Sequence, residues 1–224
     1  MPEFFTNSPD RLPIQLLANP NESAITLSKW LTNAGDDLPD LLHKNGAILF
    51  RGFGVTSAAA FEAVCRSGTP DLTDYTGGGS PRTHVAGKVY TSTEYAADQY
   101  IPLHCEYTYF PEVPPYIWFN CEQAPESGGE TPIGDMQHVR KKLDPELVNR
   151  FETRGVRYIY NLHGGNGFGR GWRESFGTDD QSAVEQWLDN IQTEYHWESD
   201  GTLHVELNSP RDTGSPGNRG CRLG

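Results

Sequence analysis

Apolar residues recur at two different spacings along the chain, and each spacing predicts a different kind of element. Over residues 23–43 they fall at every third or fourth position, which predicts one amphipathic helix that Gly46 ends. The run AILFRGFGV (residues 47–55) is short, continuous and closed by glycines, which favours a buried strand. A further helix is expected over residues 58–65.

Glycine and proline divide the middle of the chain. Residues 69–87 are rich in Gly, Pro, Ser and Thr and show no period, which is typical of a long loop of the kind that often serves function. Strands are expected over residues 103–110 and 116–122, separated by PEVPP, whose prolines cannot continue a central ladder. A short strand over residues 130–133 is expected after the turn ESGG.

The second half of the chain alternates between helical and strand patterns. VRYIYNL (residues 156–162) alternates in polarity, which predicts a strand, and Asp144 followed by Pro145 marks the start of a helix. The patterns predict helices over residues 135–142, 144–154 and 181–192 and a last strand over residues 202–207. Strands of mixed order with grouped helices favour an α+β fold built on an antiparallel sandwich or barrel.

Composition limits the classes of protein that this pattern can represent. The chain has 224 residues, which fits one domain with a sizeable core. Its formal net charge of −12 and its lack of a basic run argue against a nucleic-acid partner. No stretch of about 18 apolar residues and no leader pattern occurs, so no membrane partner is expected. The four cysteines form no CxxC pair, and a reducing, cytoplasmic setting is expected.

The segment LHCEYTYFPE (residues 103–112) carries the candidate chemistry. In an extended chain His104 and Glu106 leave the same face, a geometry that suits two ligands of one ion. A half-exposed strand with polar residues on its wet face would show the same pattern. The aromatic residues that follow favour burial, and a buried carboxylate needs a cation. Metal binding is therefore the sharper hypothesis.

The longer stretch LHCEYTYFPEVPPYIWFNCEQAPESGGETPIGD (residues 103–135) resembles the iron(II)- and 2-oxoglutarate-dependent dioxygenases of the taurine dioxygenase (TauD/TfdA-like) group. AILFRGF, SPRTHVAGKVYTSTEY (residues 80–95) and WRESFGT (residues 172–178) extend the likeness over most of residues 40–206. Members typically carry His-x-Asp, and Glu106 makes this chain more similar to the clavaminate-synthase-like branch. The resemblance implies a double-stranded β-helix (jelly roll) core with flanking helices.

This resemblance also implies site residues and cofactors. His104 and Glu106 would be two ligands of Fe(II), and Thr131 in GGET would contact a carboxylate of 2-oxoglutarate, the co-substrate that reacts with O2. Two imidazoles and one carboxylate on one face of Fe(II) leave open positions for 2-oxoglutarate and oxygen. The implied reaction is hydroxylation of a small-molecule substrate, amino-acid-like or carrier-bound. Arg82 is either a partner of a substrate carboxylate or a solvated loop charge.

The last part of the family pattern is not recognisable in this chain. A second histidine and a later arginine would be expected from the resemblance, and His204 falls too early to fill the histidine position, so the third metal ligand is expected to be missing. We therefore expect an incomplete dioxygenase domain over residues 1–207, an irregular tail over residues 208–224, and weak Fe(II) binding. An unclosed sheet exposes strand edges, so a homo-oligomer is one expected state.

Two other classes of protein fit the same residues. A non-catalytic jelly-roll module would use the aromatic segment to bind a small molecule, and a metal-dependent hydrolase or isomerase would need an acid/base pair beside the ion. Dependence on oxygen separates the dioxygenase from both. Asn161 and Trp172 lie in family-like stretches, where they either border the pocket or serve a structural role.

Overall fold

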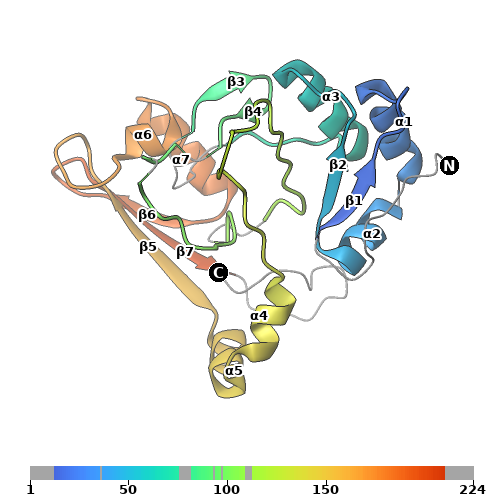
Figure 1. The fold of residues 1–224 in the computed structure, drawn as a ribbon. Helices are drawn as coiled ribbons and strands as arrows, with labels where there is room; N and C mark the ends of the chain where they lie inside the picture. Colours follow the sequence, from blue (N-terminus) through green and yellow to red (C-terminus); the bar gives the residue numbers. More distant parts are fainter. Residues whose placement is uncertain are drawn as a thin grey trace. The chain divides into compact units, whose positions relative to one another are not determined.

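The computed structural model describes residues 13–35, 37–75, 82–92, 94–96, 98–108 and 113–209. These residues form two compact units. The first unit lies within residues 1–74, 82–94 and 115–135, and the second within residues 75–81, 95–114 and 136–224. Each unit has its own cluster of buried apolar side chains, and the elements of both are labelled in Figure 1.

The first unit combines three helices with two small pairs of strands. The helices are α1 (Ala24–Ala34), α2 (Asp37–Asn45) and α3 (Ala58–Gly68). The strands are β1 (Ile14–Leu17), which pairs in parallel with β2 (Ile48–Arg51), and β3 (His84–Ala86), which pairs antiparallel with β4 (Val89–Tyr90). A parallel pair needs a long crossover, and α1 and α2 provide it. The buried cluster consists of Leu27, Leu31, Leu38, Phe53 and Val64.

The second unit is built on one antiparallel sheet of three strands in the order β5-β7-β6 (Figure 1). The strands are β5 (Val156–Leu162), β6 (Glu194–Trp197) and β7 (Leu203–Ser209). The helices are α4 (Met136–Lys142), α5 (Pro145–Arg154), α6 (Trp172–Phe176) and α7 (Gln181–Asn190). One face of the sheet packs against α7 and Trp172, through Val184 and Leu188 on the helix and Leu203, Val205 and Leu207 on β7.

Several predicted elements are confirmed. Helix α5 begins where Asp144 accepts a hydrogen bond from the backbone N–H of Glu146, with Pro145 at the first helical position. Strand β5 has the predicted bounds and alternates in burial as its polarity does. Helices α3, α4 and α7 and strand β7 lie within a few residues of their predicted ranges. The α+β class is therefore confirmed.

The single helix predicted over residues 23–43 is wrong, because the structure has two helices there. Gly35 has a φ of 43° and ends α1, and its backbone N–H donates to the carbonyl of Leu31. Glycine adopts a positive φ at little cost, so it ends helices readily. The strand predicted over residues 47–55 is shorter and only half-buried, since β2 covers Ile48–Arg51.

The strands predicted over residues 103–110, 116–122 and 130–133 are also wrong. Residues 103–105 are irregular, residues 106–108 form a turn, and neither 116–122 nor 130–133 contains a strand; residues 109–112 lie outside the described part. A strand needs a neighbour to pair its backbone groups, and the prolines of this region remove donors from any such ladder. The β1, β3, β4 and β6 strands and the α6 helix were not predicted.

The described strands make two sheets of two strands and one of three, and these strands form no closed jelly-roll barrel. Within the same described ranges, no helix is long and apolar enough to cross a membrane. The division into a domain over residues 1–207 and a tail over 208–224 stays a prediction, and residues 210–224 lie outside the described part.

Candidate metal centre

His104 lies in the second unit, where a backbone carbonyl orients its ring. Its Nδ1 lies 2.8 Å from the carbonyl oxygen of Pro102. Because a carbonyl oxygen only accepts, Nδ1 must carry the proton and donate. In the neutral imidazole the lone pair is then on Nε2, the arrangement commonly found in metal-binding histidines.

The carboxylate of Glu106 lies close to this lone pair. The Nε2 of His104 and the Oε1 of Glu106 are 3.6 Å apart. Two ligand atoms that each lie about 2.1 Å from one ion are about 3.0–3.4 Å apart at octahedral to tetrahedral angles. The side chains of His104 and Glu106 are 48% and 23% exposed, so an ion between them would remain accessible to a further ligand. The observed separation of 3.6 Å is slightly longer than this range, so a small rotation of either side chain would bring both atoms to bonding distance of one divalent metal ion.

A turn, and not a strand, brings the two side chains together. Tyr107, which follows Glu106, has a φ of 57°, a conformation that is uncommon outside glycine. Its ring makes an edge-to-face contact with Tyr75, with centroids 5.6 Å apart. The hydroxyl of Thr108 lies 3.5 Å from that of Tyr158 on β5. These contacts attach the turn to the second unit.

The residues proposed to bind 2-oxoglutarate and substrate lie in the first unit. Thr131 is exposed in an irregular segment. The guanidinium of Arg82 is half-buried, and its Nη1 donates to the carbonyl of Thr91 over 3.4 Å. The roles of Thr131 and Arg82 stay predictions.

His204 has partners of its own on the sheet. Its Nδ1 lies 2.7 Å from Oδ1 of Asn161, and its Nε2 lies 3.3 Å from Oε1 of Glu206. Its ring stacks on that of His196. No three His, Cys, Asp or Glu side chains among the described residues are placed to hold one ion, so this part of the chain offers His104 and Glu106 without a third such ligand.

The sequence contains a repeated feature that pattern reasoning missed. His-x-Glu occurs three times, at residues 104–106, 196–198 and 204–206. The second and third copies lie on or directly after β6 and β7, where alternating side chains share a face. The spacing by itself therefore does not single out His104 and Glu106, and the flanking sequence does.

Trp172, considered as a pocket residue, belongs to the core of the second unit. It is 1% exposed, and its ring meets that of Trp197 edge to face, with ring centroids 5.2 Å apart.

In the first unit, burial raises the pKa of the Cys65 thiol to about 12, so this cysteine is not a thiolate at neutral pH.

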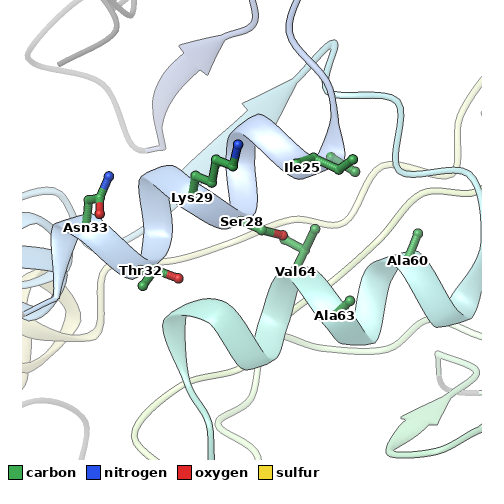
Figure 2. A pocket seen from close by; sticks show the side chains of 9 residues that line it. Ile25, Ser28, Lys29, Thr32, Asn33, Ala60, Ala63 and Val64 are labelled. Carbon is green, nitrogen blue, oxygen red and sulfur yellow. The ribbon is translucent and has the colours of Figure 1, made fainter.

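A shallow groove of about 560 Å³ lies between α1 and α3 of the first unit (Figure 2). Small and aliphatic side chains such as Ile25, Ala60 and Val64 line it, together with Ser28 and Lys29. Its lining contains no histidine or carboxylate, and it includes none of the predicted site residues.

Comparison with known proteins identifies the family of this chain. Residues 13–210 match the family described as taurine catabolism dioxygenase TauD, TfdA family. The chain belongs to this TauD/TfdA family. The match is longer than the likeness recognised over residues 40–206, since it includes β1 and α1.

Two relatives of this TauD/TfdA protein carry more specific names. A clavaminate synthase-like protein of Arabidopsis thaliana is 40% identical over 172 residues, which cover 73% of this chain and 52% of the relative. The dapdiamide synthesis protein DdaC of Enterobacter agglomerans is 34% identical over 168 residues, which cover 75% of this chain and 50% of that protein. The chain thus spans about half the length of the curated relatives it matches. These names agree with the clavaminate-synthase-like branch.

Proposed function

We propose that this protein is an Fe(II)- and 2-oxoglutarate-dependent dioxygenase in which His104 and Glu106 bind the metal ion. The observation that carries the proposal is the convergence of His104 Nε2 and Glu106 Oε1, 3.6 Å apart, in a chain of the TauD/TfdA family. The pairing of one imidazole with one carboxylate suits ferrous iron, which binds sites of two histidines and one carboxylate in such oxygenases.

Each proposed residue has a distinct task. The Pro102 carbonyl holds the proton on Nδ1 of His104, which keeps Nε2 available for the metal ion. Glu106 contributes negative charge, Thr131 donates its hydroxyl to a 2-oxoglutarate carboxylate, and Arg82 binds an anionic group of the substrate. When bound, Fe(II) with 2-oxoglutarate and O2 supplies the oxidising chemistry.

The proposed substrate is an amino-acid-like small molecule or a carrier-bound form of one. The support comes from the names of the two relatives, one for dapdiamide synthesis and one clavaminate synthase-like. Activity of a chain that spans about half of each relative is part of the proposal. Family membership does not favour the alternative of a non-catalytic binding module. The cytoplasmic location stays a prediction.

Metal affinity and oxygen-dependent succinate release together test the proposal. We expect His104→Ala and Glu106→Gln each to weaken Co(II) binding, used as an air-stable substitute for Fe(II), by at least about 10–100-fold. Both variants should also abolish succinate release from 2-oxoglutarate by protein supplied with Fe(II) and O2. His43→Ala, an exposed histidine at the end of α2, is the matched control and should change neither quantity.

Two results would overturn the assignment. Co(II) affinity that is the same in His104→Ala as in the parent protein would remove the metal site. Succinate release that persists in Glu106→Gln would remove the carboxylate from the chemistry.

A further inference from the structure

Strand β5 lies at one edge of the three-stranded sheet of the second unit (Figure 1). It pairs with β7 along one side, and no other strand of the described residues pairs with its second side. An open side of this kind presents backbone N–H and C=O groups that can pair with another strand. β5 has seven residues and one charged side chain, Arg157, so neither short length nor high charge protects this side.

The backbone hydrogen bonds of β7 show which residues of β5 face the open side. The carbonyl of Thr202 accepts from the N–H of Glu198 over 2.8 Å, so the backbone groups of Thr202 face β6. The direction of these groups alternates from residue to residue along a strand. The backbone groups of Leu203 therefore face β5, and those of Leu162, which lies opposite Leu203, face β7.

By the same alternation, the N–H and C=O groups of Arg157, Ile159 and Asn161 face the open side of β5. His163 continues this series directly after the strand, and its carbonyl accepts from the N–H of Trp172 over 3.2 Å. This bond occupies the open side at His163, so the stretch that can accept another strand ends there.

We propose that two copies of this chain associate through β5, with the two strands antiparallel about a two-fold axis at Ile159. In this register Ile159 lies opposite its counterpart in the second copy, and Arg157 lies opposite Asn161 of that copy. These are the three residues whose backbone groups face the open side, so each opposed pair can exchange two hydrogen bonds. A two-fold interface uses the same surface on both copies, which this register satisfies.

The side chains of β5 suit this register. Ile159 is 55% exposed, and contact between two copies would remove part of this apolar surface from water. Tyr158 lies opposite Tyr160 of the second copy, and aromatic pairs on adjacent strands are stabilising. The one charged side chain, Arg157, meets the neutral Asn161, so no like charges oppose each other.

The ends of the strand suit the register as well. The residue opposite His163 would be Gly155 of the second copy, which lies between α5 and β5. The partner strand therefore begins just where the bond from Trp172 closes the open side. Pairing is confined to β5 itself, and the association stops at two copies.

The other edge of the sheet fits a second copy less well. β6 (Glu194–Trp197) has four residues, and a two-fold pairing centred on His196 would place Glu194 opposite Glu198. Like charges directly opposite each other destabilise a strand pair. Charge complementarity therefore favours β5 as the paired edge. The interface does not depend on the proposed dioxygenase activity.

Sedimentation equilibrium of the full chain tests the proposal. The background variant is Tyr100→Ser with Leu103→Ser, which removes a separate segment of exposed apolar side chains. We expect the average mass to rise with concentration from one chain to two. Ile159→Lys should raise the dissociation constant of the dimer more than about tenfold, because two cations would face each other at the axis.

A charge exchange at Ile159 tests the two-fold register itself. Ile159→Glu should weaken its own dimer as Ile159→Lys does, since two carboxylates would then be opposed. An equimolar mixture of the two variants should form a mixed dimer with a dissociation constant at least about tenfold below that of either variant alone. A mixture that associates no better than its components would show that the two copies of residue 159 are not opposed, and would overturn the proposal.

Controls separate this interface from general association and from loss of the fold. Ile25→Lys, at an exposed isoleucine of α1, should leave the dissociation constant unchanged. If Ile159→Lys fails to fold by circular dichroism, Ile159→Thr decides the matter, because threonine keeps the β-branched shape that strands favour. It should raise the dissociation constant about threefold. An unchanged constant, or a background protein that stays monomeric, would overturn the proposal.

Discussion

At the scale of the residue, Tyr107 sets the geometry of the predicted iron site. A non-glycine residue at φ 57° costs roughly 1–2 kcal/mol, and such strain persists only where surrounding contacts maintain it. The contact with Tyr75 is one of these. If the turn relaxed to an extended chain, His104 Nε2 and Glu106 Oε1 would no longer be held in their present positions.

Two substitutions at Tyr107 separate the turn from the aromatic ring. Both Tyr107→Asn and Tyr107→Val remove the ring, but asparagine tolerates a positive φ and β-branched valine does not. We expect Tyr107→Val to weaken Co(II) binding at His104 and Glu106 more than Tyr107→Asn does, as measured by calorimetry. Equal affinities in the two variants would contradict a role for the backbone conformation.

Asp74 gives the first unit a defined response to acid. The hydrogen bond from Lys88, and then its charge, hold the pKa of this carboxyl below its ordinary value of 3.8. A carboxyl with a lowered folded-state pKa stabilises the fold fully above its ordinary pKa, and this stabilisation is lost as the pH falls through the lowered value.

The predicted pH window is therefore below about pH 4. Asp74→Asn should lower the free energy of unfolding at pH 7 by no more than about 1 kcal/mol, because the pair is largely exposed. The difference from the parent protein should shrink as the pH falls below 3.8, as measured by urea unfolding. Asp71→Asn, on the same segment, is the control. A difference in the free energy of unfolding between Asp74→Asn and the parent protein that grows as the pH falls would contradict this prediction.

At the scale of the element, the sheet of the second unit depends on one helix face. Leu188 of α7 is 0% exposed and packs among apolar residues of β7. Leu188→Ala should lower the free energy of unfolding by about 2–5 kcal/mol, since it removes buried area and leaves a cavity. Denaturant unfolding followed by tryptophan fluorescence measures this loss.

Leu147 in α5 provides the matched control for Leu188. It is 40% exposed, so Leu147→Ala should change the free energy of unfolding by no more than about 0.5 kcal/mol. A comparable loss in both variants would mean that the α7 face does not hold the sheet.

Elements with strong local signals were predictable from the sequence. Asp144 and Pro145 mark the start of α5, and the alternation of residues 156–162 marks β5. The strands expected over residues 103–110 and 116–122 have strand-like composition but no paired neighbour among the described residues. Composition reports that a residue tolerates an extended backbone, whereas a strand requires a partner, which only the folded chain provides.

At the scale of the whole molecule, segments distant in sequence define the two units. Trp118 was expected on a strand over residues 116–122. It instead packs in the first unit, where its ring stacks on Phe50 at 6.4 Å and its Nε1–H donates to the Thr69 hydroxyl at 3.0 Å. Aromatic residues near a candidate site in sequence therefore did not identify its surroundings.

The exposed segment before His104 predicts self-association. Tyr100 and Leu103 are 87% and 61% exposed, with Ile101 between them. Adjacent exposed apolar side chains favour association with other apolar surfaces. We expect the sedimentation coefficient to rise with protein concentration, and Tyr100→Ser with Leu103→Ser to reduce that rise.

The control for association is Ile25→Ser, an exposed apolar residue outside this segment. An equal effect of this change would mean that the association is not specific to residues 100–103. A sedimentation coefficient that is independent of concentration in the parent protein would contradict self-association altogether.

The sequence by itself determined the family, the α+β class and the helices with clear caps, because these depend on neighbours within a few residues. It also placed a histidine and a glutamate two residues apart, but it did so three times with the same spacing. Only the tertiary structure decided how each pair is arranged: a turn at positive φ for His104 and Glu106, and the strands β6 and β7 for the other two pairs. The physical reason is that ligand geometry depends on backbone conformation and strand pairing, and contacts distant in sequence select both.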